Sequence, residues 1–343
     1  MLVLGIETSC DETSVAVVER GINIISQIVS SSLDFHSKFG GIIPEAASRY
    51  HLESIIPILD VVFKKSKIEP KDLDLVAATY GPGLLGALMI GLNVAKTISF
   101  SLNIPLIPVN HILAHLYAPF LTKGFKPQFP AIGLVVSGGH TELFYIKEFN
   151  VLRLLGKTRD DACGEVFDKV AKILGLGFPG GPAIEEWAKK GNSRIKFKCA
   201  SFKDSLDFSF SGIKTAVLYH VKKITANGTP LTVNEISDIC ASFQESIFSV
   251  LVEKARQACI MKKTRRLILG GGVTANSYLR ERLNEMAKRE RIEIFFPRRE
   301  LCMDNAAMVA GLGYRLYKLD NIKTDYSLEP KPVIELGGEN ALR

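Results

Sequence analysis

Two histidines four residues apart, His111 and His115, carry the strongest chemical signal in this sequence. If their segment is helical, residues four apart lie on one face, so both imidazoles can reach one cation. The chain holds only six histidines, so chance rarely produces such a pair, and capping or packing histidines are the alternative. Asp304, a lone acid at the start of an apolar run, is a candidate third ligand. A carboxylate that merely favours a helix N-terminus is the alternative for it.

The residue after the first histidine argues against a zinc peptidase of the H-E-x-x-H kind. Such an enzyme needs a glutamate there as its general base, and this chain has Ile112. Two neutral imidazoles and one carboxylate favour Zn²⁺ or Fe²⁺ over Mg²⁺. The sequence does not choose between these two metals.

Three polar or glycine-rich turns could present backbone N–H groups and hydroxyls to a phosphate. Thr8 and Ser9 lie in the first, and Ser137 opens the second, which continues with two glycines. The third, residues 269–276, places three consecutive glycines between a strand and a helix, where backbone can approach a ligand closely. Each alone fits an ordinary connection. Together, with two in matching positions, they favour a nucleotide cleft.

Asp11 and Glu12 follow the first turn and offer two carboxylates that can orient an amine or accept its proton. A pair of surface acids in a turn is the alternative. Lys214 could neutralise a phosphate, yet an isolated helix lysine is more often simply solvated. We therefore predict that the two acids are catalytic and assign no role to the lysine.

Length and composition indicate the class of fold that must position these residues. The chain has 343 residues, 47% of them hydrophobic, and a formal charge of +7, which suits two lobes of ~150 residues each. Disordered, collagen-like and small disulfide-stabilised classes are excluded. The six cysteines are scattered and never form C-x-x-C, which predicts free thiols in a reducing compartment. The absence of a leader, and an apolar stretch at 81–95 shorter than the ~20 residues of a membrane span, predict a cytoplasmic protein without membrane contact.

A strand, a polar turn and a second strand occur twice, at residues 2–18 and 132–146, which predicts a duplicated fold. Hydrophobic periodicity predicts further strands near 75–79 and 267–269, and helices at 45–65, from 84, 165–174, 183–190, 212–223, 234–261 and from 274. This alternation indicates two α/β lobes with mixed sheets and a cleft between them. Residues 122–130 are the best boundary candidate. We expect an N-terminal lobe at 1–128, a C-terminal lobe at 129–301, and a metal-ligand helix and tail at 302–343.

Seven motifs together resemble the bacterial-type tRNA N6-adenosine threonylcarbamoyltransferase (TsaD) family. In chain order they read GIETSCDET, GGIIPEAASR, HILAH, VSGGHT, DACGEVFDK, GGGVTAN and DNA. The resemblance runs from Met1 to about Tyr317, and the tail from Lys318 onward lacks a signature. It implies the actin/Hsp70/sugar-kinase (ASKHA) fold, with two RNase H-like lobes and a nucleotide cleft between them. This agrees with the duplicated plan.

The resemblance implies transfer of threonylcarbamoyl from threonylcarbamoyl-AMP to N6 of the adenosine at position 37 of tRNAs reading ANN codons. It implies one metal on His111, His115 and Asp304. The substrate contacts that the resemblance implies are Val136, Ser137, Gly138, Gly139, His140, Asp168, Gly181 and Asn276. Thr8 and Ser9 of the first polar turn are candidate contacts from their residue types. Glu185 is a further candidate ribose acceptor, with a solvated helix-start acid as the alternative.

Implied partners are tRNA, an inactive paralogue (TsaB) and a small P-loop ATPase (TsaE). Basic runs such as residues 262–266 are candidates for phosphate tracking, although such runs are usually solvated faces. Two other classes stay open: a small-molecule kinase of the same fold and a regulatory nucleotide-binding protein. The histidine pair speaks against the kinase, and the complete set of motifs speaks against a degenerate binding protein.

Overall fold

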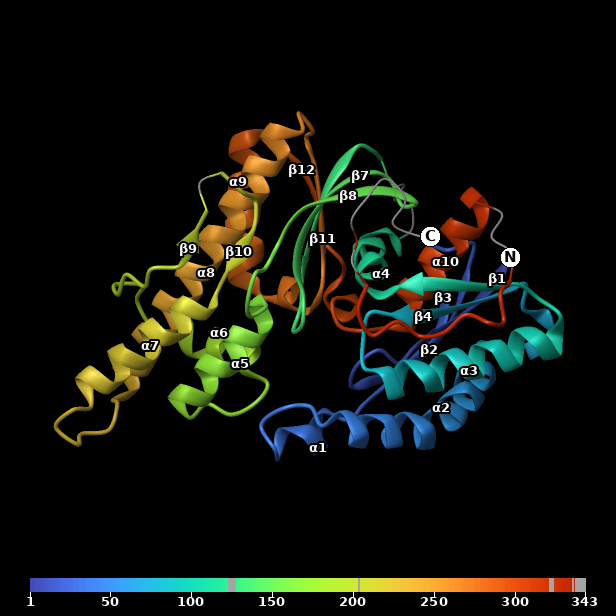
Figure 1. The fold of residues 1–343 in the computed structure, drawn as a ribbon, viewed down its shortest axis with the longest axis horizontal. Coiled ribbons are helices and arrows are strands. Elements are labelled where there is room, and N and C mark those ends of the chain that lie inside the picture. Colours follow the sequence, from blue (N-terminus) through green and yellow to red (C-terminus); the bar gives the residue numbers. More distant parts are fainter. Residues whose placement is uncertain (123–127, 203, 321–323, 335, 337–343) are drawn as a thin grey trace. The chain divides into compact units, whose positions relative to one another are not determined.

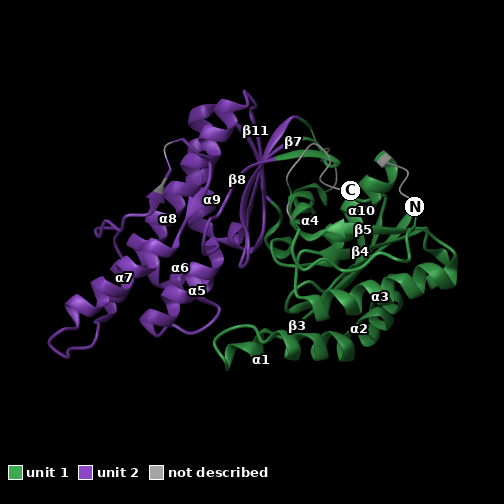
Figure 2. Ribbon diagram, in the orientation of Figure 1, with its two compact units in different colours: residues 1–129, 146–153, 297–343 green, residues 130–145, 154–296 purple. Residues whose placement is uncertain are grey.

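The computed structural model describes residues 1–122, 128–202, 204–320, 324–334 and 336 (Figure 1). The chain divides into two compact units (Figure 2), the first comprising residues 1–129, 146–153 and 297–343 and the second 130–145 and 154–296. The C-terminal helix, expected as a segment of its own, is thus counted with the first unit. Residues 123–127 of the expected boundary segment lie outside the described residues.

A five-stranded sheet with the order β3-β2-β1-β4-β5 forms the centre of the first unit. Its strands are β1 (Leu2–Glu7), β2 (Glu12–Glu19), β3 (Asn23–Ser31), β4 (Leu75–Gly81) and β5 (Leu106–Asn110). The first three are antiparallel, whereas β4 pairs in parallel with β1 and β5 in parallel with β4. Short polar turns suffice for the antiparallel connections, while parallel neighbours need the longer helical crossovers.

Helices cover both faces of this sheet. They are α1 (Leu33–Ser37), α2 (Pro44–Ser66), α3 (Leu85–Leu102), α4 (His111–Tyr117) and α10 (Ala306–Asp320), with short 3₁₀ turns at Pro70–Asp72, Ala118–Phe120 and Arg299–Leu301. Leu4 and Ile6 of β1 enter the core that also holds residues of α2 and α3. A Cβ on Gly5 would instead lie 2.2 Å from the Ala306 carbonyl oxygen of α10. Because side chains alternate along a strand, Glu7 shares the α10 face with Gly5.

Side-chain caps set where α4 and α10 begin. Asn110 Oδ1 accepts the Leu113 N–H at 3.1 Å, so His111 is the first residue of α4. Asn305 Oδ1 accepts the Met308 N–H at 3.0 Å, which leaves Asp304 just before α10. Such caps satisfy N–H groups that the first helical turn leaves without partners.

The second sheet has the order β12-β11-β6-β7-β8. Its strands are β6 (Ala131–Val136), β7 (Thr141–Glu148), β8 (Val151–Lys157), β11 (Arg266–Gly270) and β12 (Glu293–Phe295). Read from the other edge, the order is β8-β7-β6-β11-β12, so three strands that are consecutive in the chain come first. Strand β11 is parallel to β6, and β12 is parallel to β11. This is the strand order of the first sheet, so the predicted duplication is confirmed.

The helices of the second unit are α5 (Cys163–Leu174), α6 (Gly180–Ala188), α7 (Ser211–Ile224), α8 (Val233–Met261) and α9 (Ser277–Glu290), with a short β9 (Ala200–Ser201) and β10 (Phe208–Ser209). The helix expected from Thr274 was wrong by three residues, because a 3₁₀ turn (Gly272–Ala275) precedes α9. Gly271 has φ +91°, and a Cβ there would lie 2.4 Å from the Val136 carbonyl oxygen. Packing against β6 therefore requires this glycine, whatever ligand approaches it.

Among the described helices, only α3 is long and apolar enough to cross a membrane. Six of its residues, including Leu88 and Leu92, are buried in the first unit, where the helix packs on β4 and α2. Leu85 and Met89 on the same helix are about half exposed. The helix thus contributes to the core and also carries apolar side chains on the surface.

Gly5→Ala should lower the free energy of unfolding by about 1–3 kcal/mol, because the added methyl group overpacks the contact between β1 and α10. Chemical denaturation of the parent and the variant measures this difference. Gly41→Ala is the matched control, since a Cβ there meets nothing within 4 Å. Equal stability of the two variants would contradict the close contact.

Candidate functional site

His111, His115 and Asp304 come together in the first unit, where α4 begins and just before α10. One potential ligand atom from each residue lies within 4.8 Å of the others. Asp304 Oδ1 is 3.6 Å from His111 Nε2 and 3.1 Å from His115 Nε2. The imidazole ring centroids are 4.7 Å apart. The predicted helical placement of the histidine pair is confirmed.

The surroundings of His115 suit a metal ligand. Its side chain is fully buried, and neither ring nitrogen makes a hydrogen bond within the described part of the chain, where a polar neighbour of the ring is Asp304 Oδ1, 3.1 Å from Nε2. A buried polar nitrogen without a partner is costly unless a ligand satisfies it. Two imidazoles and a carboxylate are also a donor set that transition metals accept. The residues present therefore fit a divalent cation.

Further carboxylates place a strong negative field at this cluster. Glu7 is fully buried, and Asp11 and Glu12 are 8% and 7% exposed. Burial, together with the charges of Asp304 and Asp11, raises the pKa of Glu12 to about 10. Close like charges of this kind favour the neutral acid, and a nearby cation favours the carboxylate. A bound divalent ion would thus reverse the electrostatics that Glu12 experiences.

Glu7 and His111 perturb each other. Burial acts to lower the pKa of His111, but the charges of Asp304 and Glu7 outweigh it and raise that pKa to about 9. Burial acts to raise the pKa of Glu7, but the charge and hydrogen bond of His111 hold it below its ordinary value. The two residues therefore behave as a buried charge pair when no cation is bound.

The first polar turn brings one of its two expected hydroxyls to this cluster. Ser9 Oγ lies 3.1 Å from His111 Nδ1. Thr8 Oγ1 instead donates to the Ala87 carbonyl of α3 at 2.9 Å. The Thr8 hydroxyl therefore ties β1 to α3, and Ser9 alone extends the cluster.

Sequence analysis did not identify Glu7 or His51 as site residues. His51 lies buried on α2, where its Nε2 is 3.0 Å from the Cys10 carbonyl and its Nδ1 2.7 Å from Thr13 Oγ1. Burial lowers the pKa of His51, which favours the neutral ring that donates to one partner and accepts from the other. His51 thus pins the turn that holds the two acids. A contact across some forty residues leaves no local signal in the sequence.

In the second unit, the turn of residues 137–140 lies against the start of α5. Ser137 N–H donates to the His140 carbonyl at 2.8 Å, and His140 N–H donates to Ser137 Oγ at 3.1 Å. Gly164 N–H of α5 donates to the Ser137 carbonyl at 3.1 Å. A Cβ on Gly138 or Gly139 would meet nothing within 4 Å. The turn is therefore closed on itself and leaves open space beside its glycines.

The other expected substrate residues connect three helix starts in this unit. Asp168 Oδ1 of α5 accepts the Gly180 N–H of α6 at 2.7 Å. Glu185 Oε1 of α6 accepts the Ser277 N–H of α9 at 2.9 Å. Asn276 Oδ1 caps α9, and its Nδ2 donates to Gln244 Oε1 at 2.9 Å. A Cβ on Gly181 would meet nothing within 4 Å. These side chains thus stabilise the helix arrangement around an open position at Gly181.

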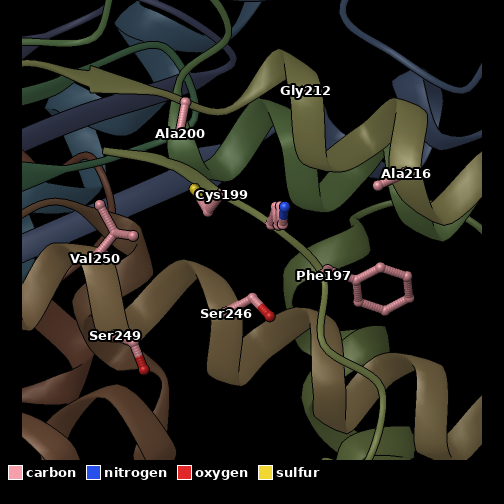
Figure 3. A pocket seen from close by; sticks show the side chains of 9 residues that line it. Phe197, Cys199, Ala200, Gly212, Ala216, Ser246, Ser249 and Val250 are labelled. Carbon is pink, nitrogen blue, oxygen red and sulfur yellow. The ribbon is translucent and has the colours of Figure 1, made fainter. Parts of the chain in front are cut away.

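A cavity of about 700 Å³ in the second unit holds none of these residues (Figure 3). Three of its side chains are used within the fold: Ser246 Oγ donates to the Ser242 carbonyl, Ser249 Oγ to Glu245, and Cys199 Sγ to the Ser209 carbonyl. The cavity is lined by Phe197, Lys198, Cys199, Ala200, Gly212, Ala216, Ser246, Ser249 and Val250. It therefore offers little chemistry compared with the histidine cluster.

Solved structures with similar folds include component A of (R)-2-hydroxyglutaryl-CoA dehydratase from Acidaminococcus fermentans. It is 17% identical with a TM-score of 0.55, and the match covers 92% of this chain and 98% of that one. HypF of T. kodakarensis is 15% identical with a TM-score of 0.60, over 92% of this chain and 48% of that one. These likenesses show the fold alone, and they confirm the expected actin/Hsp70/sugar-kinase architecture.

Sequence comparison identifies the family. Residues 23–311 match the profile of TsaD, tRNA N6-adenosine threonylcarbamoyltransferase. The Dictyoglomus turgidum protein of that name is 47% identical over 98% of this chain and 99% of its own length. The Bacillus cereus protein of that name is 48% identical over 92% of each chain. This chain therefore belongs to the tRNA N6-adenosine threonylcarbamoyltransferase family.

Proposed function

We propose that this chain transfers a threonylcarbamoyl group from threonylcarbamoyl-AMP to N6 of the adenosine at position 37 of tRNAs reading ANN codons. The observation that carries the proposal is the His111–His115–Asp304 cluster in a member of this family. The reaction is substitution at the carbonyl of a mixed carbamic–phosphoric anhydride, from which AMP leaves. It requires a grip on the adenylate, stabilisation of negative charge and orientation of a weakly nucleophilic amine. Neither a kinase nor a regulatory binding role gains support from the family.

His111, His115 and Asp304 are the proposed ligands of one divalent ion, Fe²⁺ or Zn²⁺. When bound, the ion would supply Lewis-acid stabilisation to oxygens of the substrate. The two imidazoles hold their positions because α4 is capped by Asn110 and all seven of its residues are buried. Fixed ligands lose little freedom when they bind an ion.

Residues of the second unit are proposed to hold the adenylate part of the donor. They are Val136, Ser137, Gly138, Gly139, His140, Asp168, Gly181, Glu185 and Asn276. Within the first unit, Thr8 and Ser9 are proposed substrate contacts of their own, and for Thr8 this contact would be in addition to the bond that its hydroxyl donates to the Ala87 carbonyl. The open space beside Gly138, Gly139 and Gly181 supports close approach of a phosphate or ribose. Carboxylates such as Asp168 and Glu185 are suitable acceptors for ribose hydroxyls.

Asp11 and Glu12 are proposed to orient the acceptor amine or take its proton. Both are largely buried in the turn that His51 pins, so their positions are restrained. A base must be ionised, and the raised pKa of Glu12 disfavours this unless a cation is nearby. The base role of Glu12 thus depends on a cation in the same cluster.

The proposed partners are tRNA, the inactive paralogue TsaB and the P-loop ATPase TsaE, with the cytoplasm as the site of action. Four apolar side chains are exposed, Leu52 and Ile56 of α2 and Leu85 and Met89 of α3, and this set, called the apolar surface below, supports a protein partner. Helices α2 and α3 lie side by side in the first unit (Figure 1). We propose that the paralogue covers this surface, since large exposed apolar patches mark interaction sites.

His115→Ala should remove most of the bound metal, because one proposed ligand is lost. The fold should stay intact, because the buried side chains of Ile112, Leu113 and Leu116 still hold α4 in the core. Elemental analysis of purified protein, together with thermal unfolding, measures both. His220→Ala on α7 is the control and should retain the parental metal content. Unchanged metal in both His115→Ala and His111→Ala would refute the proposed ligand set.

Gly181→Leu should abolish measurable binding of AMP, because the new side chain fills space that the ribose needs. The fold should persist, since a Cβ at this position meets nothing within 4 Å. Isothermal calorimetry measures the affinity. Glu186→Leu places the same side chain at an exposed position of the same helix and should bind like the parent. Parental affinity in Gly181→Leu would show that the pocket is misplaced.

The parent, supplied with threonylcarbamoyl-AMP, tRNA and the two partner proteins, should form threonylcarbamoyladenosine, detected by mass spectrometry of tRNA nucleosides. At least one of Asp11→Asn and Glu12→Gln should keep metal and AMP binding yet lose ~10²–10⁴-fold in single-turnover rate, as expected for a lost acid–base group. Near-parental rates in both variants would leave positioning and charge stabilisation to explain the step.

Omitting each partner in turn measures its contribution to the same reaction. A parent that forms no product with both partners and an intact metal content would contradict the proposed activity itself. Ile56→Lys tests the apolar surface, because it places a charge there. The yield of product should fall in reactions where the paralogue increases it and stay at the parental level in reactions without the paralogue.

A further inference from the structure

We infer that Glu7 is a positioning residue that fixes the tautomer and orientation of His111, so that the ring presents Nε2 for ligation. This inference rests on the proposed metal site. It concerns a side chain that touches a proposed ligand and not the reacting atoms.

Glu7 lies where three hydrogen-bond donors converge. Its Oε1 accepts the Ser9 N–H at 2.6 Å, and its Oε2 accepts the Thr79 hydroxyl at 2.5 Å. The same Oε2 lies 3.3 Å from His111 Nδ1. The side chain is fully buried, so water does not replace these contacts. An ionised carboxylate only accepts, and each contact here therefore requires a donor opposite it.

This requirement determines which nitrogen of the His111 ring carries the proton. Were Nδ1 unprotonated, its lone pair would face the carboxylate oxygen and repel it. Nδ1 must therefore carry the proton, and Ser9 Oγ, 3.1 Å away, is a second acceptor for it. In a neutral imidazole the other nitrogen then has the lone pair. That nitrogen, Nε2, lies on the side of Asp304, 3.6 Å from its Oδ1.

The two histidines of the cluster differ in this respect. His115 makes no hydrogen bond through either ring nitrogen within the described residues, whereas His111 is held by Glu7 and Ser9. A carboxylate behind a ligating imidazole orients the ring and raises its basicity. Glu7 thus restrains the one ring of the pair that has such a contact, and the alternating face of β1 puts it there.

Glu7→Gln tests whether His111 needs an acceptor at Nδ1, because an amide cannot accept from all three donors. If the amide oxygen faces the Ser9 N–H, the NH₂ group faces His111 Nδ1 and favours the tautomer protonated on Nε2, which does not ligate. If the amide is flipped, the NH₂ group opposes the Ser9 N–H. Either arrangement weakens ligation through His111.

The experiment compares zinc affinity in the parent, Glu7→Gln and Thr79→Val by competition with a chromophoric chelator. Glu7→Gln should bind Zn²⁺ about 10–100-fold more weakly, the usual cost of losing such an outer contact. Thr79→Val keeps the carboxylate and its contact with the ring, removes one donor, and should stay within about threefold of the parent. Equal affinity of Glu7→Gln and parent, or equal losses in both variants, would overturn the inference.

A spectroscopic measurement on the parent tests the same inference without any change to Glu7. Long-range ¹H–¹⁵N spectra of the zinc-loaded protein, assigned with His111→Ala, should show the His111 ring protonated at Nδ1 and ligated at Nε2. Ligation through Nδ1 would overturn the inference. A parent that binds no Zn²⁺ would refute the proposed metal site, and with it this inference, whereas tight parental binding with Nδ1 ligation refutes the role of Glu7 alone.

Discussion

The close packing of α10 against β1 is the contact on which the metal cluster depends. Gly5 lets the helix backbone approach the strand, and the Ala306 N–H donates to Ser14 Oγ of β2 at 2.9 Å. Farther along α10, a Cβ on Gly313 would lie 2.4 Å from the Cβ of Ala77 of β4. The helix is thus seated on three strands, and Asp304, just before it, is delivered to the end of β1 where the histidines of α4 also lie.

The cluster lowers the stability of the first unit in the absence of a cation. Several carboxylates lie in a largely buried region, and the pKa of Glu12 rises to about 10 as a result. Apolar packing on the other face of the sheet offsets this, since Leu4, Ile6 and the helices α2 and α3 form a continuous core there. A ligand that binds only the folded state stabilises it further. Sites of this kind trade stability for chemical function.

The two units share a strand order and differ in chemistry. In the first, charged groups and imidazoles converge at the start of α4. In the second, Asp168, Glu185 and Asn276 are occupied by backbone N–H groups or amides at helix starts, and the open positions lie at glycines. Each unit is thus specialised locally, although both are built on the same strand order.

Local spacing was enough to predict the duplicated strand–turn–strand unit and the one-faced histidine pair, because strand and helix periods act over a few residues. The family was indicated by the resemblance of seven motifs taken together, and not by spacing. Asp304 was only a candidate third ligand from the sequence. The tertiary structure brought its carboxylate close to the two histidines. Packing alone decided that Thr8 turns toward α3, that Gly271 serves the backbone of β6, and that His51 and Glu7 belong to the site. Glu7 and His111 are 104 residues apart, and their contact exists only because β1, β4 and β5 pair side by side. No local pattern encodes a hydrogen bond that depends on how distant strands are ordered in a sheet.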